Sequence, residues 1–134
     1  MMRPMSADPA REALRRMLSN GPLTGWPRRP SDQELLVELA AGRFEPGREY
    51  REAEVNDAIR AWLETFCAPY GIDHVTMRRM LVDARRLVRE KNGSTYRTHP
   101  ESPRGSGAVD PAQVLAQVSD ERAARKRSHP GSAS

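Results

Sequence analysis

Two stretches near the middle of the chain repeat their apolar residues with the period of a helix. The first begins at Ser31, which predicts a capping box with Glu34, and ends at Gly42. Its apolar positions are Leu35, Leu36, Leu39 and Ala40. The second covers residues 52–66, and its apolar face consists of Val55, Ile59, Trp62, Leu63 and Phe66. Both patterns predict helices that bury one face in a core.

A third helix is expected over residues 74–88, with Asp73 as its N-cap. At about 100° per residue, its apolar positions share one arc of about 120°. These are Met77, Met80, Leu81, Ala84, Leu87 and Val88. A separate arc holds Arg78, Arg79, Arg85, Arg86 and Arg89, together with Val75 and Val82. The pattern predicts a core-facing helix with an arginine-lined outer face.

A β-hairpin is expected directly after the third helix, around Asn92-Gly93. The predicted turn is type I′, because Asn and Gly tolerate the positive φ that this turn requires at both central positions. This turn would place Arg89 opposite Tyr96. One short extended segment is also expected at residues 48–50, between the first two helices.

The two flanks of the chain are rich in Pro, Gly and Ser. Residues 1–30 are expected to hold a short helix at 8–19 and then a linker, in which Trp26 packs on the core. Residues 100–134 are expected to be a flexible tail with one candidate helix at 110–127. The last residues of this tail are expected to be disordered.

The composition limits the chain to one small domain with flanks. It has 134 residues, of which 37% are apolar and 30% are charged. No apolar run approaches the roughly 18 residues of a membrane-spanning helix. Cys67 is the single cysteine, so the chain cannot form an internal disulfide or a cysteine-based zinc site. We therefore expect a cytoplasmic protein that does not contact a membrane.

Charge is distributed unevenly along the chain, although the net charge is only +4. Residues 31–73 hold four Arg against ten Asp or Glu, a net of −6. Residues 74–99 hold six Arg and one Lys against two acidic residues, a net of +5. The basic half suits an anionic partner. The basic residues are 20 Arg and only two Lys, a bias that a GC-rich genome could also produce. The uneven charge could also come from opposite faces that neutralise one another in the fold or in a dimer.

The order of the expected elements is typical of a winged helix-turn-helix. Residues 31–99 would form this domain, which is mainly α with a small β-hairpin. In that fold the third helix enters the major groove of DNA, and the hairpin, or wing, touches the neighbouring backbone. Winged helices also serve as protein–protein modules, so the fold alone leaves the function open.

Several separated motifs resemble the domain of unknown function 2087 family. They are FEPGREY at 44–50, EVN at 54–56, DHVTMRRMLVD at 73–83, Arg89, NG at 92–93 and YR at 96–97. The resemblance covers residues 31–98. It implies a link to gene regulation, because the family occurs in small bacterial proteins and in transcriptional regulators, sometimes behind a separate DNA-binding domain. It implies no known ligand and no enzyme activity.

The chain departs from the family pattern at three places. Arg51 replaces the usual Ser or Thr before the second helix, which removes an N-cap worth about 1 kcal/mol. Arg85 stands near a usual Gly after the third helix, which favours a longer helix and a shifted wing. Residues 62–73 form a longer link than usual, which leaves the angle between the second and third helices open.

The candidate nucleic-acid-binding residues belong to the third helix and the wing. They would bind phosphates, and one or two arginines would bind a guanine edge. They are Val75, Thr76, Arg78, Arg79, Val82, Arg85, Arg86, Arg89, Lys91 and Arg97. The alternative for the arginines is salt bridging to Asp83 or to the two acidic helices. The alternative for Lys91 and Arg97 is a solvated hairpin tip.

A second set of residues is expected to be structural. It consists of Phe44, Tyr50, Val55, Asn56, Asp73, Leu81, Asn92, Gly93 and Tyr96. Asn56 is polar within an apolar-periodic helix, so we expect it to make a buried hydrogen bond to the loop at 44–50. His74 is interpreted as a polar surface residue.

The sequence favours a small regulator-like protein that binds nucleic acid, duplex DNA in particular, through its third helix and wing. The alternative is a protein-interaction or dimerisation module, whose basic face docks on an acidic partner or on the acidic half of a second copy. The acidic pairs lack a His or Lys partner for acid–base chemistry, and the three His are scattered. We therefore expect no enzyme activity, no metal and no cofactor.

Overall fold

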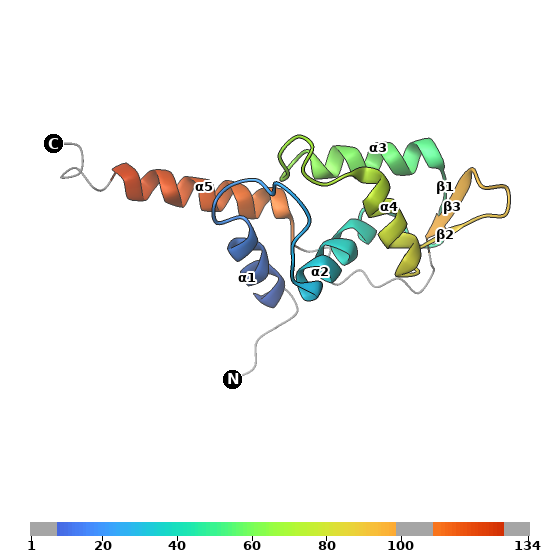
Figure 1. The fold of residues 1–134 in the computed structure, drawn as a ribbon, viewed down its shortest axis with the longest axis horizontal. Helices are drawn as coiled ribbons and strands as arrows, with labels where there is room; N and C mark the ends of the chain where they lie inside the picture. The colour runs from blue at the N-terminus through green and yellow to red at the C-terminus, as the bar shows by residue number, and fades with distance from the viewer. Residues whose placement is uncertain (1–7, 99–108, 128–134) are drawn as a thin grey trace.

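The protein is mainly helical, with a small antiparallel sheet. The computed structural model describes residues 8–98 and 109–127, and within them it has five helices and three strands. The helices are α1 (Asp8–Met17), α2 (Pro30–Ala41), α3 (Glu52–Leu63), α4 (His74–Asp83) and α5 (Pro111–Arg127). The strands are β1 (Glu49–Arg51), β2 (Leu87–Arg89) and β3 (Thr95–Thr98). The sheet lies at one end of the molecule and α5 at the other (Figure 1).

Helices α2, α3 and α4 pack around a common apolar core. Leu36 of α2, Val55 and Ile59 of α3, and Met77 and Leu81 of α4 are all fully buried. Burial of one such side chain contributes about 1.5–3 kcal/mol. The helical period of the sequence therefore identified these five core positions correctly. It missed Val37, which is buried, and the predicted positions Leu35 and Met80 are only partly buried.

The sheet has the strand order β1-β3-β2. The extended segment predicted at 48–50 thus joins the hairpin as its third strand, displaced by one residue. Tyr96 in the central strand pairs with Tyr50 on one side and with Arg89 on the other. The predicted register between Arg89 and Tyr96 is confirmed.

The predicted type I′ turn of the hairpin is wrong. Gly93 has a φ of 76°, whereas Asn92 is not in the positive-φ region. The N–H of Gly93 donates to the carbonyl of Glu90 over 2.9 Å, which is the pattern of a type I turn followed by a left-handed glycine. The Asn92 side chain accepts hydrogen bonds from the N–H groups of Ser94 and Thr95, and this forward contact specifies the turn.

Helix α4 ends at Asp83, five residues before the predicted end at residue 88. Leu87 is buried, but as part of β2 rather than of the helix, and Val88 is exposed. The two arcs predicted for a 74–88 helix therefore do not exist beyond Asp83. The helical pattern continued past the end of the helix because a strand residue happened to keep its period.

A Schellman motif terminates α4. The N–H of Arg85 donates to the carbonyl of Val82, and the N–H of Arg86 donates to the carbonyl of Leu81, over 3.0 and 2.8 Å. Arg85 has a φ of 62°, in the left-handed region that glycine usually occupies at this position. The expectation of a longer helix is therefore wrong: the chain makes the glycine-type ending with an arginine.

The start of α2 also differs from the prediction. The helix begins at Pro30, with Arg29 as N-cap, so Ser31 lies inside the first turn and forms no capping box. Proline is favoured at this first position because its missing N–H would have no partner there. At α3, Arg51 is the N-cap and its side chain does not cap. The Glu54 carboxylate accepts the Arg51 backbone N–H over 2.8 Å.

A long loop joins α3 to α4. Helix α3 ends at Leu63 rather than at the predicted residue 66, although Phe66 is buried and packs edge-on against Trp62 with ring centroids 4.8 Å apart. The loop is tied to the N-terminal linker by a parallel bridge between Leu23 and Cys67. The extra length of this link is therefore ordered by the linker.

The flanking helices pack against each other and on the core. Leu14 of α1, Leu18 directly after it, and Val114 and Val118 of α5 are buried in the same apolar cluster. Trp26 of the linker is half-buried against this cluster, as predicted. The expectations for the remainder of the tail, at 100–108 and 128–134, lie outside the described residues.

Candidate nucleic-acid interface

Three exposed cations lie on α4 and on the hairpin that follows it. Arg79 is on the solvent-facing side of α4, Arg85 follows the end of the helix, and Lys91 lies at the hairpin turn. None of the three makes a hydrogen bond or ion pair with a described residue. No carboxylate of the described residues therefore pairs with these three charges. Arg79, Arg85 and Lys91 are called the free cations below.

Arg78 is held inside the domain. Its Nη1 donates to Asn56 Oδ1 over 2.5 Å, and its guanidinium lies over the ring of Tyr96, 5.9 Å from the centroid. The expected bond from Asn56 to the loop at 44–50 is therefore wrong, because the amide of α3 faces α4 instead. Arg78 joins α3, α4 and β3 and is half-buried.

Tyr96 extends this contact to the start of α3. Its hydroxyl donates to Glu52 Oε1 over 3.1 Å. Burial and the hydrogen bond to Glu52 raise the pKa of Tyr96 above its ordinary value. Glu52, Asn56, Arg78 and Tyr96 thus form one network between the helices and the sheet.

The loop at 44–50 is ordered by its own aromatic residues. Phe44 is buried and packs edge-on against Tyr50, with ring centroids 5.1 Å apart. The backbone N–H of Glu45 donates to the Tyr50 hydroxyl over 2.8 Å. These contacts fold the turn that leads into β1, and they do not involve Asn56.

Arg86 and Arg89 also have partners within the chain. Arg86 Nη2 donates to Glu38 Oε1 of α2 over 2.7 Å. Arg89 folds back on its own hairpin and donates to the carbonyl of Gly93 over 2.9 and 3.1 Å. The five arginines predicted for one arc therefore divide into three with partners and two without.

Arg97, on the exposed side of β3, is surrounded by acceptors. Its guanidinium donates to Glu90 Oε1 over 3.1 Å and to the carbonyl of Gly47 over 3.2 Å, and it lies 3.7 Å from a Glu49 carboxylate oxygen. The positive charge of Arg97 is therefore largely compensated by neighbouring carboxylates.

The first turn of α4 is capped as predicted. Asp73 Oδ2 accepts from the N–H and the hydroxyl of Thr76, each over 3.2 Å. Burial opposes ionisation of Asp73, but the hydrogen bonds from Thr76 outweigh it and hold the pKa of the carboxyl below its ordinary value. The Thr76 hydroxyl is thus used within the helix start. Val75 and Val82 are half-buried on α4.

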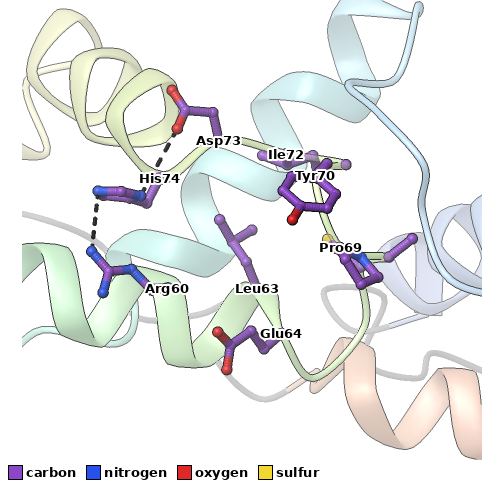
Figure 2. Close-up of a pocket in the computed structure, with 11 residues that line it drawn as sticks. Arg60, Leu63, Glu64, Pro69, Tyr70, Ile72, Asp73 and His74 are labelled. Carbon is purple, nitrogen blue, oxygen red and sulfur yellow. Dashed lines mark hydrogen bonds and ion pairs between the residues drawn. The ribbon is translucent and has the colours of Figure 1, made fainter.

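A cleft of about 730 Å³ lies between the C-terminal end of α3 and the loop before α4 (Figure 2). His74 lies between Arg60, 3.5 Å away, and Asp73, 3.8 Å away. Burial raises the pKa of Cys67, also in the lining, to about 12, so this thiol stays protonated at neutral pH. Within residues 8–98 and 109–127, no three His, Cys, Asp or Glu side chains gather as metal ligands.

Tyr70 at this cleft is a feature that the sequence analysis missed. Its side chain is 104% exposed and its φ is 65°. The next residue, Gly71, is closely packed, since a Cβ there would lie 2.8 Å from the Leu23 carbonyl oxygen. Pro69 and Gly71 signalled a turn, but no sequence pattern indicated that the tyrosine between them would face solvent.

Comparison with known families gives a match over residues 22–98, to the model described as uncharacterized protein conserved in bacteria, domain of unknown function 2087. The chain belongs to this family. The match begins in the linker, where Leu23 pairs with Cys67, and ends with β3, so the family unit includes the linker but neither α1 nor α5. Neither the curated proteins nor the solved structures give a match. Among the described residues, no helix has the length and apolar character to cross a membrane.

Proposed function

We propose that this member of the 2087 family is a non-enzymatic, regulator-like protein that binds duplex DNA. In this proposal residues 31–98 act as a winged helix, with α4 at the major groove and the β2–β3 hairpin as the wing. The observation that supports it is the exposure of the three free cations on α4, at its end and at the hairpin turn, without partners among the described residues.

The mechanism would be electrostatic docking with little base reading. Arginine and lysine contacts to phosphate release counterions, so the binding constant falls as salt rises, with a logarithmic slope of about −0.9 per contact. Because Arg78, Arg86 and Arg89 are engaged within the chain, three contacts are expected rather than five or more. The expected slope is therefore about −3.

A fluorescence anisotropy titration on a labelled duplex of random sequence, at several salt concentrations, tests the proposal. The double variant Arg79→Ala/Arg85→Ala should weaken binding at least about tenfold at low salt and reduce the slope by about 2. The control is Arg28→Ala/Arg29→Ala, which removes the same charge from the exposed linker. The DNA-binding proposal would be contradicted if the wild type did not bind at low salt, or if the control variant lost as much affinity as Arg79→Ala/Arg85→Ala.

A further inference from the structure

A groove of about 500 Å³ lies between α2 and α4. Met80 of α4 and Ala84, directly after the helix, contribute apolar surface to it, and Glu34 and Asp83 place carboxylates along it. Neither of these two carboxylates has a partner among the described residues, whereas Glu38 in the same lining is paired with Arg86. The groove is therefore partly apolar and has an excess of negative charge.

The C-terminal half of α5 has the complementary character. All residues from 119 to 127 are exposed, and this part of the helix projects beyond α1, away from α2 and α4 (Figure 1). Two hydrogen bonds join α5 to α1 close to residue 119, where the projecting part begins. Arg11 donates to Gln117, and Arg15 donates to Glu121. The helix therefore points away from the groove of its own chain.

One stripe of this projecting segment combines small and cationic side chains at helical spacing. It consists of Ser119, Arg122, Ala123 and Lys126. Small side chains let another helix approach closely, and the two cations are separated by one helical turn. In the groove, the two carboxylates without a partner among the described residues are Glu34 of α2 and Asp83 of α4. The two surfaces therefore carry opposite charges.

We propose that the projecting end of α5 docks in the α2–α4 groove of a second copy of this chain, and that two copies exchange these helices reciprocally. A reciprocal exchange closes the assembly as a two-fold dimer. The projecting end of α5 lies at the opposite end of the molecule from the hairpin (Figure 1), whereas the groove borders Arg85 through Asp83, Ala84 and Arg86. The proposal is therefore tested by dimerisation in the absence of DNA, a readout that does not depend on the DNA-binding proposal. The occupant is a second copy rather than nucleic acid because small residues accompany the cations and the groove supplies the carboxylates.

Sedimentation velocity of the full chain tests the proposal. We expect a dimer at about 100 µM protein in low salt and a monomer at about 0.5 M salt, where the Debye length falls to a few ångströms. Two double variants, Glu34→Lys/Asp83→Lys in the groove and Arg122→Glu/Lys126→Glu on α5, should each be monomeric. Their mixture should dimerise again, because each altered surface then meets an oppositely charged one.

The control is Asp57→Lys/Glu64→Lys, which reverses two exposed charges on and beside α3 and should leave the dimer intact. Matching thermal unfolding of all variants would establish that they fold. A wild type that stays monomeric in low salt would overturn the proposal. A dimer that survives both double variants, or a mixture that stays monomeric, would overturn it as well.

Discussion

Arginine side chains differ in their contacts at the α1–α2 interface and near the end of α4. At the first, both terminal nitrogens of Arg16 donate to the Asp32 carboxylate, over 3.0 and 2.8 Å, and the Asp32 side chain is only 6% exposed. At the second, Arg79 and Arg85 stand in solvent with no partner among the described residues. An arginine thus joins two helices at the first place, whereas at the second place its charge faces solvent.

The difference lies in the partner rather than in the arginine. A carboxylate that is buried must be compensated, so Arg16 is required for the fold. Arg79 and Arg85 have no partner among the described residues, so we expect their removal to have little effect on stability and a large effect on binding of an anion. Arg86 is intermediate, because the side chains of Arg86 and Glu38 are 26% and 36% exposed.

The largest effect on stability is expected for Asp32→Asn. The change keeps the shape but removes the charge that receives both Arg16 nitrogens, and charged hydrogen bonds of this kind contribute about 1.5–3 kcal/mol. Urea denaturation at neutral pH should show a loss of stability of about that size. The matched control, Asp120→Asn on the exposed part of α5, should change stability by under about 0.5 kcal/mol.

The same pair has a defined pH dependence. The hydrogen bonds from Arg16 lower the pKa of Asp32 in the folded protein below its ordinary value. The stabilisation is therefore complete above about pH 4, the usual unfolded pKa, and is lost as the pH falls through the lower folded value. The difference between wild type and Asp32→Asn should shrink below about pH 4, and a constant difference would contradict this assignment.

A smaller effect of opposite sign is expected at the end of α4. Arg85 adopts a φ of 62°, which costs a residue with a Cβ about 1 kcal/mol. Arg85→Gly should therefore raise the free energy of unfolding by about 1 kcal/mol, as measured by urea denaturation. Arg85→Ala keeps the Cβ and serves as the control. If the Gly and Ala variants are equally stable, the positive φ of residue 85 costs nothing and this prediction is wrong.

The smallest effect is expected for Glu38→Gln, which weakens the pair with Arg86. Partly exposed ion pairs contribute about 0–1 kcal/mol, and this pair should lie near the middle of that range. Glu34→Gln, one turn earlier on α2, is the control, because Glu34 has no partner within residues 8–98 and 109–127. A loss as large as that for Asp32→Asn, in the same urea denaturation, would remove the distinction between a buried pair and a half-exposed one.

The sequence predicted the core more accurately than the surface. Burial follows a pattern that local periodicity expresses, so Val55, Ile59 and Leu81 were assigned correctly. The end of α4 was missed because Leu87 keeps the helical period while it belongs to a strand. The hydrogen bond from Arg78 was missed for another reason. Its acceptor, Asn56, lies 22 residues away, and no spacing rule joins the two.

The chain's own pattern determined the order of the central helices and strands, the buried faces of α2, α3 and α4, and the uneven charge between residues 31–73 and 74–99. These properties depend on residues that are close in the sequence. The rotation per residue of a helix and the polarity of each side chain are therefore enough to predict them. Tertiary structure alone decided which cations are neutralised and which face solvent. That outcome depends on the distance to carboxylates on other elements, because an ion pair forms only where folding brings both charges together.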